Sequence, residues 1–213
     1  PVAGLLQGEG GPTCDIAQLL VAWLADGCWS ERDPKVWFNL KKERKKVRIR
    51  KLLANAGIPW TEHVQPSSRA WTSFRIRKTD FAAVLDLASE GKRWRWEWLS
   101  WDAEIRDLML HEIGYWDGDF GNDEDGSRER DAVAASAATR FFSAERQDAD
   151  VVSAMAAITG AGAIVRADDR VDRPEQRTQY VVNIHHRRRP GRPARPDGPE
   201  GRHRAGGRAG PEG

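Results

Sequence analysis

The sequence predicts an α+β fold built from two αββαββ-type repeats. Three observations predict it. The first half alternates helical and strand patterns in the order α-β-β-α-β-β-α, the second half repeats that order weakly, and the two halves meet in the tryptophan-rich segment 94–101. We expect the repeats at residues 15–101 and 102–186, between an N-terminal extension at 1–14 and a disordered tail at 187–213. One chain then forms a pseudo-dimer.

The first half opens on an amphipathic helix at residues 15–26, whose apolar residues recur at the i, i+3, i+4 spacing and which Gly27 ends. Two short β-like runs around a Glu-Arg-Asp-Pro turn predict a hairpin, and a basic helix then stops at an Asn-Ala-Gly sequence. A second strand pair and a short helix capped by Thr79 or Asp80 complete the half. After the first helix, the expected ranges are 28–30, 35–40, about 42–56, 60–64, 71–76 and a last helix to about 87.

The second half is a weaker copy of this order. Asp102 is placed to cap a helix whose apolar residues again form one stripe, as far as Trp116. After a long polar loop we expect a strand pair, a helix that ends before a Gly-Ala-Gly-Ala sequence, and two further strands. These elements are expected at 133–142, 148–158, 164–167 and 179–185.

Tryptophans alternate with other residues between the halves, at Trp94, Trp96 and Trp98, and Trp101 follows closely. Because bulky aromatic side chains are usually buried, the alternation predicts a linker with one face packed on the core. A stacking platform for single-stranded nucleic acid is the alternative interpretation.

Composition excludes several classes of protein. No run approaches the roughly 20 apolar residues of a membrane-spanning helix, and the first residues lack the pattern of a signal peptide. Cys14 and Cys28 have neither the spacing of a zinc site nor that of a disulfide framework. We therefore expect no membrane partner and a reducing, cytoplasmic location.

Charge is segregated along the chain, although the net charge is only +2. Residues 41–78 hold twelve Lys or Arg and two Glu, residues 102–175 hold eight Arg and eighteen acids, and the tail 187–213 holds eight Arg and three acids. For a nucleic-acid binder the distribution of charge matters more than its sum. The cations of the basic helix are interpreted mainly as a solvated face with some phosphate contact.

Two helix ends carry similar acidic sequences. The first reads Leu19-Leu20-Val21-Ala22-Trp23-Leu24-Ala25-Asp26-Gly27, and the second reads Gly114-Tyr115-Trp116-Asp117-Gly118-Asp119-Phe120-Gly121. Both resemble the nine-residue signature of LAGLIDADG homing endonucleases, whose two copies lie about a repeat apart. The resemblance covers about residues 15–186. It implies two signature helices packed along a pseudo-two-fold axis at the repeat interface, and a saddle of β-strands that straddles DNA.

The resemblance assigns the catalytic acid to Asp26 in the first copy and to Asp119 in the second, with Asp117 as the alternative to Asp119. An Asp at the C-terminal end of a helix faces the negative end of the helix dipole, so a bound cation there is stabilising. Carboxylate oxygens suit Mg²⁺, and two such acids can position metals about 4 Å apart for phosphodiester hydrolysis. We expect the metal at Asp26, Asp119 and Gly27. A plain Asp-Gly turn is the alternative for either copy alone.

The family also places a basic residue at the end of the last strand of each half, where it can orient water or stabilise developing charge. The matching positions are Lys78 and His186, or His185 if the register shifts by one; for Lys78 the alternative is a solvated charge. DNA contacts are expected from strand side chains on the concave sheet. The candidates are Arg69, Arg75, Arg77, Arg48, Arg140 and Arg177.

The resemblance therefore implies a Mg²⁺-dependent endonuclease that cuts double-stranded DNA as a monomeric pseudo-dimer, of a kind often found inside inteins or introns. The alternative is a catalytically inactive relative, such as a splicing maturase that binds RNA or a DNA-binding regulator. The acidic second half favours this alternative, because a symmetric DNA saddle is basic on both sides. Convergence of the two helix ends is what the nuclease interpretation requires.

Overall fold

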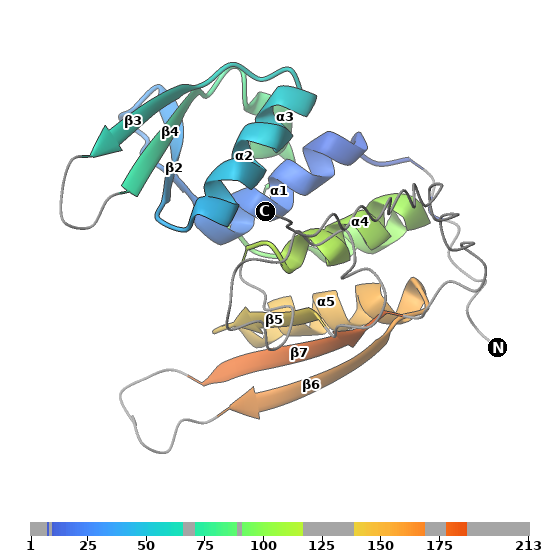
Figure 1. Ribbon diagram of the computed structural model, residues 1–213. Helices are drawn as coiled ribbons and strands as arrows, with labels where there is room; N and C mark the ends of the chain where they lie inside the picture. Colours follow the sequence, from blue (N-terminus) through green and yellow to red (C-terminus); the bar gives the residue numbers. More distant parts are fainter. Residues whose placement is uncertain are drawn as a thin grey trace, which may run out of the picture.

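Two helices form the centre of the fold, and a β-sheet lies on either side of them (Figure 1). These helices, α1 (Cys14–Asp26) and α4 (Ala103–Ile113), pack directly against each other. The computed structural model describes residues 8, 10–65, 71–88, 91–116, 139–168 and 178–186. In this part of the chain, every helix is too short or too polar to span a membrane.

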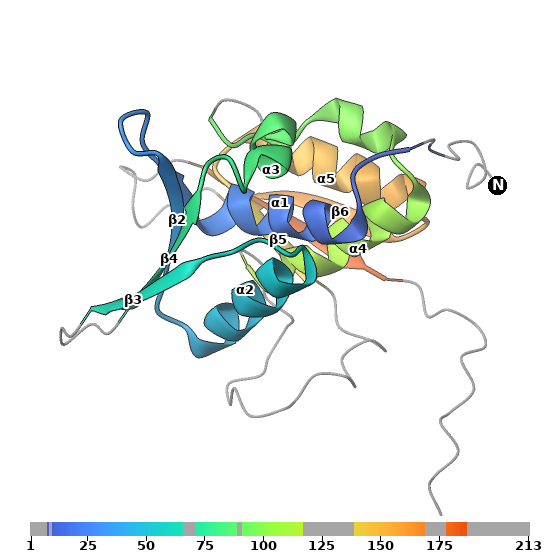
Figure 2. The ribbon, with the colours of Figure 1, turned by 90° about the horizontal axis from the view of Figure 1, so that it is seen from above.

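Helix α1 is enclosed by other elements on several sides. Thr13 caps its start, with the hydroxyl Oγ1 accepting a hydrogen bond from the Ile16 N–H at 3.4 Å. Its side chains are buried without a break from Leu19 to Trp23, so the helix lacks the single apolar stripe of a surface helix. Helices α2 (Glu43–Asn55) and α3 (Ala82–Leu87) lie on opposite sides of α1, as the view from above shows (Figure 2).

The first sheet is antiparallel, with strand order β1-β2-β4-β3. Its apolar residues alternate with polar ones along β2 and β4, so Phe38 and Phe74 face the core while Asn39 and Arg75 are exposed. The strands are β1 (Gly27–Trp29), β2 (Lys35–Leu40), β3 (Thr61–Gln65) and β4 (Trp71–Arg77).

The second sheet repeats the first in shortened form. Its order, β5-β7-β6, matches the order β2-β4-β3, and α5 packs on it (Figure 1). The elements are β5 (Thr139–Ser143), α5 (Arg146–Ile158), β6 (Gly162–Asp168) and β7 (Gln179–His185). The first strand of the pair expected at 133–142 lies outside the described residues, and β5 is the second. The topology agrees with the predicted α+β fold with two related halves.

The tryptophan-rich linker packs on the core, as the sequence predicts. Trp94 and Trp98 are 4% and 2% exposed, whereas Trp96 is 49% exposed. The segment Trp96–Ser100 forms a 3₁₀ helix, and the Trp94 ring makes edge contacts with both Trp98 and Phe141 at centroid distances of 5.6 Å. The linker thus packs against the second half through aromatic contacts.

Two helix caps differ from the sequence prediction. Phe81 occupies the cap position of α3 without a side-chain hydrogen bond, so neither Thr79 nor Asp80 caps it. The Asp80 carboxylate instead accepts two hydrogen bonds from Arg77. Asp102 does stand at the start of α4 but makes no side-chain cap bond, and α4 ends at Ile113 before reaching Trp116.

Candidate active site at the ends of the central helices

Asp26 is the last residue of α1, and its carboxylate is paired with a cation from another helix. The Lys45 ammonium of α2 donates to Asp26 Oδ2, and the two side chains are 12% and 27% exposed. A carboxylate at the negative end of a helix is locally unfavourable, so the lysine offsets both its charge and that of the helix end. Asp26 therefore lies where a cation is stabilising and where solvent can reach it.

Gly27 follows Asp26 and allows the chain to turn beside a tryptophan ring. Its φ of −66° lies in an ordinary region, so the turn itself does not require glycine. A Cβ added at Gly27 would lie 2.1 Å from Trp23 Cε3 and 2.6 Å from Cδ2. The Trp23 ring cannot retreat, because it is 2% exposed and packs edge-on against Phe38 and Phe81. Close packing against the Trp23 ring is thus one reason for glycine at position 27, in addition to the metal role predicted for the Asp-Gly ending.

Gly27→Ala is expected to destabilise the protein by about 1–3 kcal/mol, since the buried ring must shift to accept the methyl group. Chemical denaturation of parent and variant measures the change. Gly162→Ala is the matched control, because a Cβ there meets its nearest atom at an ordinary 3.7 Å. A loss at Gly27 no larger than at Gly162 would contradict the packing argument.

The basic helix α2 holds the turn that follows α4. Arg44 donates to the Gly114 carbonyl oxygen at 3.4 Å, and the Arg48 guanidinium lies 4.4 Å from the centre of the Tyr115 ring. The Lys45 ammonium, which contacts Asp26, also lies 5.7 Å from the centre of the Trp116 ring. Through Lys45, the C-terminal end of α1 and the turn after α4 are brought to one place.

Glu112 of α4 is a buried carboxylate in the same region. Its side chain is fully buried and accepts hydrogen bonds from both Nε and Nη2 of Arg48, with the Nε bond 2.9 Å long. Gln18 of α1 and the indole of Trp116 supply two further donors, at 3.2 and 2.8 Å. Burial raises the pKa of the Glu112 carboxyl, and the hydrogen bonds and charge of Arg48 oppose this rise. The network joins α1, α2 and α4.

The predicted basic residues at strand ends have other partners. The Lys78 ammonium donates to the Ser30 carbonyl oxygen at 2.7 Å and lies over the Trp29 ring. His186 follows β7 and stacks on His111 of α4. The Gly27 carbonyl oxygen accepts a hydrogen bond from Lys92 at 2.8 Å. Within the described residues, the ammonium that pairs with Asp26 is that of Lys45.

Several predicted site residues lie outside the described residues. They are Asp117, Asp119, Arg69 and Arg177. Their assignment to the metal site and to DNA contact remains a prediction.

The outward faces of both sheets carry arginines. Arg75 is exposed and pairs across the ladder with Trp37 and Thr61. Arg77 is exposed on the same face and also binds Asp80. In the second sheet, Arg140 and Arg166 are exposed and stand on the same side as Asn183. Among the predicted DNA-contacting residues, Arg48 differs because its guanidinium is engaged by Glu112.

Sequence reasoning missed three of these residues as parts of the site. The sequence places Lys45 on a solvated helix face, assigns Arg48 to that face and to DNA contact, and does not single out Glu112. The signal is present in the sequence: Glu112 lies among mostly apolar residues at the helix end, and an acid buried there needs a cation. Nothing in the sequence alone identifies which cation of the basic helix turns inward.

No protein-family model matches the chain, and no curated protein matches it in sequence. Its structure is similar to that of the homing endonuclease I-DmoI in complex with DNA and Mn, with a TM-score of 0.50 and 10% identity. That match covers 81% of this chain and 90% of the other.

The structure is also similar to full-length WhiA from Thermatoga maritima, with a TM-score of 0.52 and 11% identity. This match covers 87% of this chain and 54% of that one. The N-terminal LAGLIDADG domain of WhiA gives a TM-score of 0.50 at 12% identity, over 86% of this chain and 79% of the domain. The chain therefore has the LAGLIDADG fold, which confirms the fold prediction.

Proposed function

We propose that this chain, with its LAGLIDADG fold, is an endonuclease that hydrolyses phosphodiester bonds of double-stranded DNA with a divalent metal, Mg²⁺ in the first place. The observation that carries the proposal is the position of Asp26. It ends the central helix α1, faces a cation, and lies beside the turn that follows the partner helix α4. I-DmoI, which has the same fold, occurs in structures with DNA and with Mn, Mg or Ca.

The residues present fit a divalent cation. The Asp26 carboxylate is reachable by solvent and already balances a positive charge, and hard oxygen ligands of this kind suit Mg²⁺. The second acid is Asp119, or Asp117 as the alternative, three or one residues after the described turn at Trp116. A bound cation would supply charge stabilisation and acidify a bound water. Asp26 would orient the ion, and Lys45 would hold the carboxylate in place.

DNA would lie across the exposed faces of the two sheets. Lysine and arginine side chains there can neutralise phosphates or read guanine. We assign this role to Arg75 and Arg77 in the first half and to Arg140 and Arg166 in the second, with Arg69 and Arg177 as further predicted contacts. Arg48 is left out because Glu112 engages it.

Arg75→Ala and Arg140→Ala are each expected to weaken DNA binding by about tenfold. Each should also lower the slope of the logarithm of the binding constant against the logarithm of salt concentration by about one, because one phosphate is no longer neutralised. Fluorescence anisotropy with duplex DNA at several salt concentrations measures both effects. Arg146→Ala is the control, since Arg146 lies at the start of α5 on the opposite side of the second sheet from Arg140, over the Tyr180 ring, and pairs with Asp150. Equal affinity of all three variants would contradict the proposed surface.

Incubation of the full chain with a supercoiled plasmid library tests the cleavage itself. With Mg²⁺ we expect linear product at discrete sites, and with EDTA we expect none. Asp119→Asn and Asp117→Asn then locate the second acid, because only the ligand's variant should stop cutting. Intact plasmid with either Mg²⁺ or Mn²⁺, despite DNA binding, would refute the nuclease proposal.

The Lys45 contact favours a second candidate function. Its ammonium already supplies the positive charge that a metal would bring to Asp26. A protein of this fold that binds DNA without cutting it would need no metal to balance the charge of Asp26. Tight duplex binding without cleavage in any divalent metal is the result that identifies this second candidate.

A further inference from the structure

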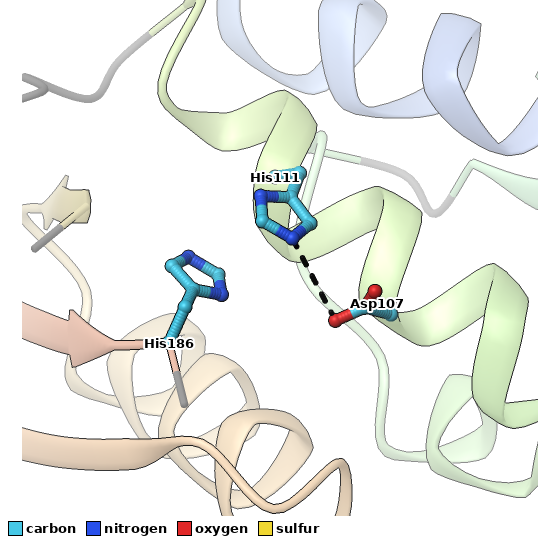
Figure 3. Close-up of side chains that lie close together, drawn as sticks. All are labelled: Asp107, His111 and His186. Atoms are coloured by element: carbon cyan, nitrogen blue, oxygen red, sulfur yellow. Dashed lines mark ion pairs between the residues drawn. The ribbon is translucent and has the colours of Figure 1, made fainter. Parts of the chain in front are cut away.

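Three potential metal ligands meet on the side of α4 that faces the second sheet. Asp107 and His111 lie one helical turn apart on α4, and His186 lies directly after β7 (Figure 3). One ligand atom from each residue lies within 4.8 Å of the other two. Two imidazoles and one carboxylate from two separate elements thus place ligand atoms close to one another.

The two histidine rings are held in a defined arrangement. They stack at a centroid distance of 4.2 Å and an interplanar angle of 12°. His186 Nε2 lies 3.2 Å from the hydroxyl oxygen of Thr139, a buried residue of β5. With the proton on Nε2 and donated to Thr139, the Nδ1 lone pair is free, and Figure 3 shows a nitrogen of this ring turned towards Asp107 and His111.

We propose that Asp107, His111 and His186 form a binding site for a divalent transition-metal cation, best satisfied by Zn²⁺. Two histidine nitrogens and one carboxylate oxygen are a common zinc ligand set, with water completing the tetrahedron. Imidazole nitrogen suits Zn²⁺ far better than it suits Mg²⁺, which prefers oxygen. The site is therefore distinct in chemistry from the one proposed at Asp26.

Rotation of the His111 ring out of the stack would bring the ligands to bonding positions. Around Zn²⁺, ligand atoms stand roughly 3.3 Å apart at the usual bond lengths. Asp107 Oδ1 and His111 Nε2 are now 3.8 Å apart, and their side chains are 31% and 46% exposed. His111 is exposed, so its ring can rotate without disturbing the core. The site is open enough for a metal to enter from solvent.

The protonation state of His186 also suits a ligand. Burial, assisted by the nearby His111 and His185, lowers the pKa of His186 to about 4, while Asp107 acts in the opposite direction. The imidazole is therefore neutral near pH 7, and no proton has to be displaced before a metal binds.

Zn²⁺ at this site would fasten α4 to the second sheet. The ligands come from α4 and from the end of β7, and Thr139 on β5 supports them. Because metal that binds only the folded state stabilises that state, the site would strengthen the attachment of the second sheet to α4.

Titration of the full chain with Zn²⁺ by calorimetry, at neutral pH, tests the proposal. We expect one saturable site and a metal-dependent rise in Tm. His111→Ala and His186→Ala should each weaken binding by at least about tenfold, and Thr139→Val by about tenfold, because supporting hydrogen bonds tune metal affinity by that amount. Co²⁺ bound in the same place should show the visible absorption of a tetrahedral complex.

The matched control is His185→Ala, an exposed histidine next to His186. It should bind Zn²⁺ like the parent, and so should Asp26→Asn, which separates this site from the proposed nuclease centre. Circular dichroism shows whether each variant is folded. Failure of the parent to bind, or equal binding by folded His111→Ala, would overturn the proposal.

Discussion

Asp26→Asn is expected to lower the rate of metal-dependent DNA cleavage by roughly 1,000-fold. The substitution removes the negative charge that holds the cation at the end of α1 and leaves the shape of the side chain unchanged. The Asn oxygen can still accept a hydrogen bond from Lys45, so the fold should persist. Single-turnover cleavage of a cognate duplex measures the rate, and anisotropy measures binding.

DNA affinity provides the control for this variant, because Asp26 lies at the helix end and the proposed DNA contacts lie on the sheets. Binding should change little, or strengthen slightly as a negative charge near phosphate disappears. Cleavage by Asp26→Asn at the parent's rate would exclude Asp26 from the metal site. Loss of binding together with cleavage would indicate a folding defect instead.

Arg48→Met is expected to lower the free energy of unfolding by about 3 kcal/mol at pH 7, since it leaves the fully buried Glu112 without its cation. An acid whose pKa is raised on folding contributes stability below its unfolded pKa and loses it as the pH rises. Burial raises the pKa of Glu112 even beside Arg48, and removal of Arg48 raises it further. The charge-dependent deficit should therefore shrink as the pH falls from 7 through the raised pKa of Glu112, and it should be relieved below about pH 4.5. Urea denaturation at pH 4 and pH 7 measures it.

Two further variants separate charge from packing. Arg48→Met combined with Glu112→Leu should recover much of the stability, because no buried charge remains. Arg50→Met is the control, since Arg50 pairs with Glu62 on the surface and such a pair contributes less than about 1 kcal/mol. An equal loss for Arg48→Met and Arg50→Met would contradict the role of burial.

The fold could be predicted from the sequence because its signals are periodic and local. The apolar spacing in α1, the alternation along β2 and β4, and the Asn-Ala-Gly stop after α2 each reflect backbone geometry that neighbouring residues determine. The similar strand order of the two halves follows from the repeated pattern. Alternating burial of Trp94, Trp96 and Trp98 was also predictable, although the segment is a 3₁₀ helix.

The partners of charged side chains could not be predicted in this way. Lys45, Arg48 and Lys78 occupy basic stretches in which every cation looks alike. Their contacts with Asp26, Glu112 and the Ser30 carbonyl depend on how α2, α4 and the first hairpin pack. Likewise, residue 186 is far in sequence from residues 107 and 111, and only the packing of the second sheet against α4 brings the three together.

Glu112 makes the interface between the central helices α1 and α4 chemically asymmetric. The acid belongs to the second half, while Gln18 and Arg48, two of its donors, belong to the first. A second copy of residues 102–186 in place of the first half would set two carboxylates face to face without these donors. We therefore expect separated halves to reassemble preferentially as unlike pairs, because a self-paired second half would lack the donors that Gln18 and Arg48 supply to Glu112.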